Sequence, residues 1–417
     1  MADVRPLRAL RYNLDVVGSL DAVAAPPYDV IDEALRADLA VRSPFNVVEI
    51  DLPRSEGGDP YLHAETTFES WRQEGIVVRD RDPAFWVLTQ EYDTPGGAVT
   101  RRGFFARVRV ENYGAGRIRP HERTQPGPRE DRLQLQRATR ANLSPIFSLY
   151  PDPNGEVLPL LEPDEPSEPD ASSTDDDGTH SRLWRVTDED ALSAVTAAML
   201  DRELLIADGH HRYETALAYA EEVGGEGEHR YVLMYLCSLS DPGLTVFATH
   251  RLLTGLDHDA GETLTAALER DFESRTVAPD ELEPAPGESI EFGFVGARDG
   301  APKRLTLRDP QTLERALASK PEPYRQIDAA VLEAIVLRGA LGMSEEDIAA
   351  RRGLAYERDA DTALRAVESG DADAAFLLAP TPIERVREVA EAGEPMPPKS
   401  TYFHPKVPTG LLFNLLE

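Results

Sequence analysis

The sequence is short of cysteine, of lysine and of long apolar runs. The single cysteine, Cys237, cannot form a disulfide within the chain, and no spacing of cysteine and histidine resembles a structural zinc site. No apolar stretch approaches the roughly 20 residues that a membrane-spanning helix needs, and the first residues lack the apolar run of a signal peptide. We therefore expect a cytoplasmic protein with no membrane partner, and Cys237 as a small buried side chain.

The balance of charge is strongly acidic. The 75 aspartates and glutamates outnumber the 44 lysines and arginines and give a net charge of −31. Only four of the basic residues are lysines (Lys303, Lys320, Lys399 and Lys406), a pattern typical of a salt-adapted, halophilic cytoplasm in which net charge serves solubility. The acidity also argues against nucleic acid as a partner, because such binding requires neutralised phosphates, although salt adaptation weakens that argument.

Two shifts in composition interrupt the acidic average. Residues 101–140 hold eleven arginines against four acids, which indicates an anionic ligand. Residues 151–180 hold ten acids, six prolines and no lysine or arginine, which favours an exposed loop or linker that the fold does not need. We therefore divide the 417 residues into an N-terminal α/β lobe (1–150), an acidic insertion (151–180), a core (181–260) and a C-terminal α+β lobe (261–417) whose tail can return to the site.

Strand and helix patterns alternate along the chain. Residues 84–93 and 102–112 mix β-branched and aromatic residues around the turn sequence TPGG, which predicts a hairpin. Helical patterns lie at 61–75 and 191–202, strand patterns lie at 203–209 and 230–240, and both kinds continue after residue 260. The sequence therefore predicts an α+β fold of mixed sheets with flanking helices.

The stretch IADGHHRYETALAY, residues 206–219, carries the strongest functional pattern. An apolar run ends at Asp208 and Gly209, and apolar residues then recur at helical spacing from Tyr213, so that a strand, a tight turn and a helix follow one another. The first turn of a helix offers N–H groups and a partial positive charge to an anion. This local structure is suited to phosphate.

The side chains at this turn fit the same ligand. Arg212 has a planar fork suited to phosphate, and His210 and His211 can donate hydrogen bonds or exchange protons as catalytic groups. Asp208 can hold a Mg²⁺ ion or orient a neighbouring histidine. A plain helix cap is the alternative, but it requires only the aspartate and the glycine. The complete cluster therefore favours a phosphate-binding site that includes Gly209.

A second candidate is the stretch 117–147. Its start is rich in proline and glycine and cannot be regular helix, so His121 and Glu122 are expected on a loop before a helix over 129–142. Glu122 is a candidate general base for a substrate hydroxyl, with His121 as a further catalytic group. The arginines of the helix can hold phosphoryl oxygens, although pairing with surface acids is the alternative for each of them (Arg129, Arg132, Arg137 and Arg140).

Two shorter stretches supply further phosphate ligands. ATHRLL, residues 248–253, follows a strand and offers His250 and Arg251, unless these side chains form a hydrogen-bond network at the strand end. PPKSTYFHPKVPTG, residues 397–410, is nearly free of acid and holds two of the four lysines. Because lysine is an unusual choice in this chain, we predict Lys399 as a phosphate ligand.

These residues stand in motifs that resemble a known family. APPYDVI, PHERT, PREDRL, RATRANLSPIF, ADGHHRYETA, DPGL, ATHR and KSTYFHPK are similar to motifs of the bacterial and archaeal domain-of-unknown-function family 1015, sometimes labelled ParB-like. The resemblance runs from about residue 4 to the C-terminus and is interrupted by the acidic insertion.

A second resemblance, to free serine kinases of the ParB/sulfiredoxin-like fold, implies an activity. Those kinases are similar in combining a catalytic glutamate in an early loop with an Asp-Gly-His-His-Arg type of turn, which correspond here to Glu122 and residues 208–212. The spacing of about 85 residues between them is longer here, and the insertion accounts for part of it. The resemblance implies a ParB/sulfiredoxin-like core with an additional C-terminal lobe.

Together, these patterns predict a phosphotransferase that acts on a small hydroxyl compound. Free L-serine is the favoured acceptor, a nucleotide or pyrophosphate is the donor, and Mg²⁺ is the expected cofactor. No Walker-type loop or protein-kinase signature is present, so the turn at 208–212 has to hold a nucleotide in another way. The alternatives are a ParB-like, nucleotide-responsive DNA-binding or partitioning protein, for which no basic helix-turn-helix is visible, and a nonenzymatic ligand sensor. The oligomeric state stays open.

Overall fold

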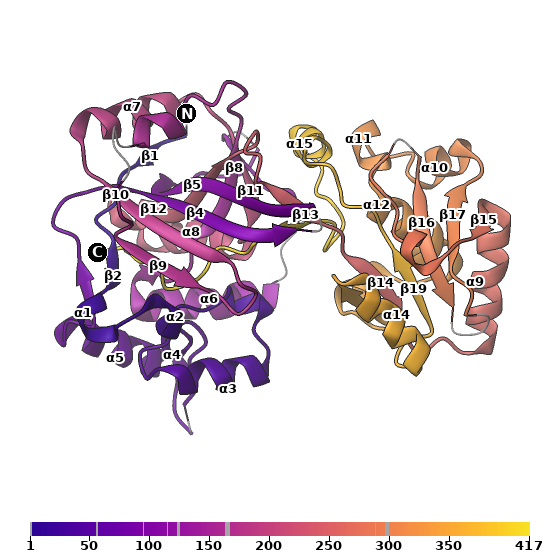
Figure 1. Ribbon diagram of the computed structural model, residues 1–417, viewed down its shortest axis with the longest axis horizontal. Helices are drawn as coiled ribbons and strands as arrows, with labels where there is room; N and C mark the ends of the chain where they lie inside the picture. Colours follow the sequence, from indigo (N-terminus) through magenta and orange to yellow (C-terminus); the bar gives the residue numbers. More distant parts are fainter. Residues whose placement is uncertain are drawn as a thin grey trace. The chain divides into compact units, whose positions relative to one another are not determined.

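A computed structural model gives the structure of the chain. It describes residues 2–55, 57–94, 96–114, 116–122, 126–162, 167–287, 289–296 and 300–417. The chain forms two compact units: unit 1 consists of Met1–Pro120, Thr124–Leu244 and Pro405–Glu417, and unit 2 consists of His121–Arg123 and Thr245–His404. Both units combine sheets with helices, so the α+β class is as predicted (Figure 1).

The two units do not follow the predicted boundaries at residues 150, 180 and 260. Strand β5 (Gly97–Arg109) pairs with β12 (Tyr231–Ser238) along its length, from Arg109 opposite Tyr231 to Gly103 opposite Cys237. Residues on both sides of the first two boundaries therefore belong to one sheet. Local composition does not report such distant pairing, and this is why the division by composition differs from the observed one.

The centre of unit 1 is a mixed nine-stranded sheet. Its strand order is β6-β11-β8-β12-β5-β4-β10-β9, with β1 paired to β5. The pairs β6·β11 and β8·β12 are parallel, whereas the predicted hairpin β4·β5 is antiparallel, with Trp86 opposite Phe105. The remaining strands of this sheet are β1 (Val4–Arg5), β4 (Phe85–Thr94), β6 (Ile118–Arg119), β8 (Ile146–Tyr150), β9 (Ala171–Thr174), β10 (His180–Val186) and β11 (Leu204–Asp208).

The main core of unit 1 lies on one face of this sheet. Alternate residues of β5 and β12, such as Phe104 and Met234, pack there with Met199 of α7 (Glu189–Met199) and Tyr213 of α8 (His210–Val223). Each large apolar side chain buried in this way contributes about 1.5–3 kcal/mol. The periodic apolar face predicted for the helix after Gly209 is thus its core face.

The other helices of unit 1 lie mainly in its first part. Helix α6 begins before the predicted residue 129, because proline is tolerated in the first turn of a helix. These helices are α1 (Leu14–Val17), α2 (Leu20–Val23), α3 (Glu33–Arg42), α4 (Val48–Asp51), α5 (Pro60–Gln73), which lies where a helix was predicted, and α6 (Pro126–Thr139).

The C-terminal residues 405–417 thread through unit 1. Strand β21 (Asn414–Leu415) pairs with β7 (Ala141–Asn142), and Thr409 and Phe413 form isolated bridges with Ala25 and Leu10. Phe413 is fully buried. Unit 1 therefore contains C-terminal residues that follow unit 2 in the sequence.

Residues 151–180 belong to unit 1 and are not the linker that their composition predicts. Val157 and Leu161 are buried in the main core, and β9 extends the edge of the sheet by pairing with β10. Asp152 is buried, accepts hydrogen bonds from the N–H groups of Glu156 and Val157, and forms an ion pair of 3.1 Å with Arg202. The average composition of residues 151–180 does not reveal that a few of them are buried in the fold.

Deletion of residues 151–180 is therefore expected to destabilise the protein strongly. The deletion removes the edge strand and two core side chains, and Leu161→Ala alone should cost about 2–5 kcal/mol. Thermal unfolding followed by circular dichroism measures both effects, with Leu160→Ala, whose side chain is half-exposed in the same turn, as the matched control. Cooperative unfolding of the deletion variant at an unchanged Tm would restore the linker interpretation.

Unit 2 is built on a six-stranded antiparallel sheet of order β15-β17-β16-β19-β14-β18. A two-stranded sheet joins β13 (Thr245–Phe247) to β20 (Tyr402–His404). The strands of the larger sheet are β14 (His250–Leu253), β15 (Phe272–Thr276), β16 (Glu291–Gly296), β17 (Lys303–Leu307), β18 (Leu354–Glu357) and β19 (Ala374–Leu377). Its longer helical segments are α9 (His258–Asp271), the π-helix η5 (Glu333–Ala340), α14 (Ala360–Ser369) and α15 (Ile383–Glu391).

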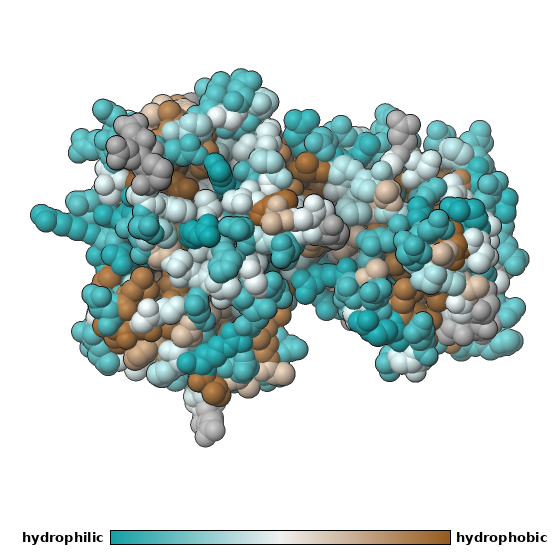
Figure 2. All heavy atoms as spheres, in the orientation of Figure 1, coloured by the Kyte–Doolittle hydropathy of each residue, from teal (hydrophilic) through white to brown (hydrophobic). Residues whose placement is uncertain are grey.

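Hydrophilic residues cover most of the surface that Figure 2 displays, as the acidic composition leads one to expect. Within the described parts of the chain, no helix combines the length and the hydropathy that crossing a membrane requires.

Candidate functional site

The predicted strand–turn–helix lies in unit 1. Strand β11 ends at Asp208, Gly209 adopts a left-handed conformation with φ of 95°, and α8 begins at His210. A Cβ atom on Gly209 would lie 3.0 Å from Nε of Arg212, so glycine is needed both for the backbone conformation and for the arginine beside it. The turn thus brings Asp208 and Arg212 together.

Asp208 forms ion pairs with two cations. Its Oδ2 accepts a hydrogen bond of 3.0 Å from Arg212, and its Oδ1 lies 3.3 Å from Nζ of Lys406. Burial alone would raise the pKa of Asp208, but Lys406, Arg212 and His210 together hold that pKa well below its usual range. The carboxylate is therefore ionised at neutral pH and is neutralised by protein cations.

This pairing does not fit the predicted role of Asp208 as a metal ligand. Both carboxylate oxygens of Asp208 already contact a protein cation, which a Mg²⁺ ion bound there would have to displace. Within the described ranges, moreover, no group of three or more His, Cys, Asp or Glu side chains is placed to hold a metal ion. We therefore assign Asp208 to positioning Arg212 and Lys406, and derive no step through a metal.

Lys406 is held in place through its backbone. Arg101 donates a hydrogen bond of 2.7 Å to the carbonyl of Pro405, and Gln90 donates one of 3.2 Å to the carbonyl of Lys406. Arg101 also donates to the side-chain oxygen of Gln90. Two neighbouring strands, β4 and β5, therefore fix the point at which the chain re-enters unit 1, and this places the ammonium group on Asp208.

Arg101 adds a third positive charge to this region. Its side chain is fully buried, and its guanidinium lies 4.5 Å from the ring centroid of Phe147, which is the register partner of Asp208 between β8 and β11. Within the described residues, Nε and one terminal nitrogen of Arg101 have no hydrogen-bond acceptor. Burial raises the pKa of Asp241, and Arg101 is among the groups that oppose this rise. Asp208 itself pairs with two cations, Arg212 and Lys406.

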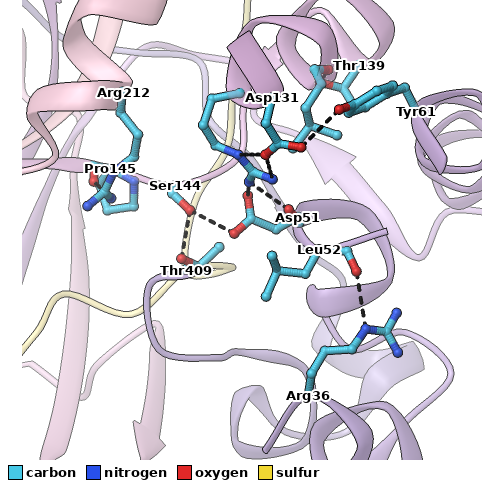
Figure 3. A network of polar contacts seen from close by, with 12 residues as sticks. Arg36, Asp51, Leu52, Tyr61, Asp131, Thr139, Ser144, Pro145, Arg212 and Thr409 are labelled. Carbon is cyan, nitrogen blue, oxygen red and sulfur yellow. Dashed lines mark hydrogen bonds and ion pairs between the residues drawn. The ribbon is translucent and has the colours of Figure 1, made fainter. Parts of the chain in front are cut away.

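A cavity of about 40 Å³ in unit 1 is lined by Arg212 and by Arg132. Arg132, from α6, is buried and donates hydrogen bonds to Asp51, of 2.7 Å to its carbonyl and 3.3 Å to its carboxylate. In Figure 3, Asp51 also points toward Ser144, which donates a hydrogen bond of 3.3 Å to it, while Arg212 reaches the carbonyl of Pro145. One arginine of the stretch 101–140 and the arginine of the turn thus line a common cavity.

Most other arginines of this stretch pair with acids from elsewhere in the chain. Arg109 contacts Glu226 at 2.5 Å and Arg137 contacts Glu222 at 2.7 Å, whereas Arg129 lies 3.8 Å from Glu214. Arg140 follows the end of α6 as an exposed residue with φ of 48°. Surface pairing, the alternative given for each arginine, accounts for Arg129 and Arg137 but not for the buried Arg132.

His121 and Glu122 lie in unit 2. His121 is buried, with its Nε2 atom 2.9 Å from the hydroxyl of Thr401 and 3.8 Å from Oε1 of Glu122. Glu122 forms an isolated bridge with Met396, and its side chain is 24 % exposed. The carboxylate of Glu122 is thus accessible to solvent, while its role as general base stays a prediction.

The three other predicted phosphate ligands also lie in unit 2. His250 is fully buried, and burial followed by the nearby Arg251 lowers its pKa to about 4, so it is neutral at neutral pH. Arg251 is buried over the ring of Tyr356 and donates a hydrogen bond of 3.2 Å to the carbonyl of Pro398. Both belong to the strand-end network given as the alternative, whereas Lys399 has a positive φ of 57° in a turn.

A family model matches most of the chain. The family model described as "Protein of unknown function (DUF1015)" matches residues 4–330. The chain belongs to this family. No curated protein matches its sequence.

Several solved structures resemble this DUF1015 chain at low identity. A conserved hypothetical protein from Pyrococcus furiosus is 18% identical, with a TM-score of 0.36 over 70% of this chain and 90% of that one. A variant of free serine kinase in complex with AMP is 15% identical, with a TM-score of 0.37 over 69% and 84%. SbnI from Staphylococcus aureus, truncated at its C-terminus, is 12% identical, with a TM-score of 0.38 over 75% and 87%.

Sequence reasoning missed Lys406 and Arg101 of this DUF1015 chain. Lys406 lies in the acid-poor tract at 397–410 that was singled out, and the scarcity of lysine applies to it as much as to Lys399. Arg101 stands at the start of the arginine-rich stretch, but only its complete burial distinguishes it from its neighbours. Both lie within segments that the sequence analysis singled out, and three-dimensional structure was needed to select them.

Proposed function

We propose that the protein is a small-molecule phosphotransferase. It transfers a phosphoryl group from a nucleotide or pyrophosphate to the hydroxyl of free L-serine or a similar metabolite, and it holds the phosphate in unit 1. One observation carries the proposal: two cations, Arg212 and Lys406, pair with the single carboxylate of Asp208 at the start of α8. An anionic ligand would balance this charge.

The residues have separate roles in this proposal. Arg212 and Lys406 stabilise charge on the phosphoryl oxygens, and the N–H groups in the first turn of α8 face the same anion. Asp208 keeps the two side chains oriented, because it is ionised and contacts both of them. His210 and His211 begin the helix, where their imidazoles can donate hydrogen bonds to phosphate or transfer a proton.

We also propose that the sheet of unit 1, with its β11–α8 turn, is the ParB/sulfiredoxin-like core. The Asp-Gly-His-His-Arg turn supports this proposal, because it follows a strand and opens a helix as the resemblance to free serine kinases implies. Unit 2 is then the additional C-terminal lobe.

A transfer assay tests the proposed activity. The full chain, in high salt with Mg²⁺, is incubated with ATP, ADP or pyrophosphate and with a panel of hydroxylated metabolites, and transferred phosphate is detected. Arg212→Gln should lose donor binding and transfer, whereas Arg137→Gln, which removes an exposed arginine paired with Glu222, should retain both. Tight DNA binding without transfer would favour the ParB-like regulator, and nucleotide binding without transfer would favour the sensor.

A further inference from the structure

The cavity of about 40 Å³ beside Arg212 has features that the phosphate proposal does not use. It lies within unit 1, and its polar lining comes from Tyr28, Asp51, Arg132, Gln136, Asn142, Ser144, Arg212 and Thr215. Such a volume has room for about three heavy atoms, because one water-sized probe occupies about 10–15 Å³. The cavity is therefore too small for a nucleoside and is suited to a single polar group.

The lining of this cavity favours an anion. Two guanidinium groups, those of Arg132 and Arg212, face one carboxylate, that of Asp51. Asp51 accepts hydrogen bonds from Arg132 and Ser144, and Asp131, which contacts Arg132 at 2.6 Å, does not line the cavity. Burial raises the pKa of Tyr28 to about 12, so its hydroxyl keeps its proton and can donate.

Two donors of the lining lack acceptors. Gln136 is 7% exposed, and its Nε2 has no hydrogen-bond partner among the residues that the structure describes. The same holds for Nε of Arg212, whose terminal nitrogens contact Asp208 and Pro145. Leaving a buried donor unpaired costs about 1–3 kcal/mol, so both groups favour a ligand that brings acceptor oxygens.

A second cavity, of about 250 Å³, allows the pairing of polar groups in the two linings to be compared. It shares Arg132 in its lining, but its other arginines are already paired. Arg54 contacts Glu33, and Arg36 lies 3.3 Å from Glu49 and donates to the carbonyl of Leu52. Among the described residues, no buried polar atom in that lining lacks a partner. The arginines of the smaller cavity are also paired, but among the described residues this cavity differs from the larger one in having buried side-chain donors without a partner.

We infer that the cavity lined by Gln136, Arg132 and Arg212 binds the carboxylate of the phosphoryl acceptor, so that the acceptor is a small hydroxy acid or hydroxy amino acid. This inference rests on the proposed phosphotransferase function. The planar carboxylate accepts from Nε2 of Gln136 and Nε of Arg212, which satisfies both donors. Arg212 then connects the acceptor to the cation cluster at Asp208, because its terminal nitrogen already contacts that carboxylate.

Gln136→Met tests the inference, because it keeps the length of the side chain and removes the donor. Gln134→Met is the matched control, since Gln134 is on the same helix and donates instead to the exposed Glu130. We expect Gln136→Met to raise KM for L-serine about ten-fold or more, with KM for the donor unchanged. Gln136→Glu should weaken the binding of L-serine further, because it adds a negative charge beside the proposed carboxylate position. Wild-type protein should discriminate against ethanolamine, which lacks the carboxylate.

A binding measurement separates this inference from the proposed function. Protection of the full chain against thermal unfolding is measured with L-serine, ethanolamine or inorganic phosphate alone. Protection by L-serine that Gln136→Met abolishes supports the inference even when no phosphoryl transfer occurs. Transfer to ethanolamine and L-serine with equal KM, unchanged in Gln136→Met, would overturn the inference and leave the phosphotransferase intact. Protection by phosphate alone that depends on Gln136 would overturn it in favour of a donor subsite.

Discussion

Replacement of Lys406 by methionine is expected to reduce phosphoryl transfer by roughly 100-fold or more and to raise KM for the donor. Methionine keeps most of the side-chain length and removes the ammonium group that lies 3.3 Å from Asp208. Arg212 is then the remaining ion-pair partner of Asp208 that the structure shows, so the positive charge beside this carboxylate falls by one unit. Initial rates at varied donor concentration and saturating acceptor measure both effects.

Lys303→Met is the control for this prediction. Lys303 is one of the four lysines but lies on β17 of unit 2, where its loss should leave transfer unchanged. A comparable loss of phosphoryl transfer in the two variants would mean that the effect comes from the net charge of the protein and not from the site at Asp208. Full donor affinity in Lys406→Met would contradict the assignment of Lys406 to the phosphate site.

The pH dependence of stability gives an independent check on the same ion pair. The pKa of Asp208 is lowered by Lys406 and Arg212 against the opposing effect of burial. A lowered pKa means that this carboxylate stabilises the fold above its unfolded pKa, and that the contribution is lost as pH falls through the folded value. Lys406→Met brings the folded pKa of Asp208 closer to its unfolded value, so the variant should be less stable than wild type at neutral pH and should lose less stability as the pH falls.

The local structure of the candidate site was predictable because its signals are contiguous. The apolar run before Asp208, the glycine and the helical period after Tyr213 all lie within one short stretch, and each has a local physical cause. The hairpin β4·β5 was predictable for the same reason, since its alternating residues flank a turn sequence.

Long-range pairing was not predictable from the same reasoning. Lys406 reaches Asp208 only because β4 and β5 hold the returning chain, and no local pattern reports the contacts of Gln90 and Arg101 with it. The excess of arginine at 101–140 likewise indicated one ligand, but acids distant in sequence, such as Glu226 and Glu222, neutralise several of these residues. Composition counts charges, whereas folding decides which of them are paired.

Glu122→Gln is expected to reduce turnover by roughly 100-fold while donor binding survives. The amide has the size of the carboxylate and can form hydrogen bonds, but it cannot accept a proton from the acceptor hydroxyl. The fold should tolerate the change, because the backbone of this segment is held by the hydrogen bond of 2.7 Å from Met396 to the carbonyl of His121. Single-turnover rates measure the chemical step, and equilibrium titration with the donor measures binding.

Glu130→Gln provides the comparison for Glu122→Gln, because Glu130 lies on α6 and its contacts with Arg137 and Gln134 are exposed. An exposed ion pair of this kind is worth about 0–1 kcal/mol. The two proposed classes of residue then separate kinetically. Glu122→Gln lowers kcat with little change in donor affinity, since a general base acts on a proton that moves only in the transition state. Lys406→Met weakens donor binding in the ground state as well, since the charge of Lys406 acts on phosphate that is already negative. Full turnover of Glu122→Gln would contradict the base assignment and leave the phosphate site of unit 1 unaffected.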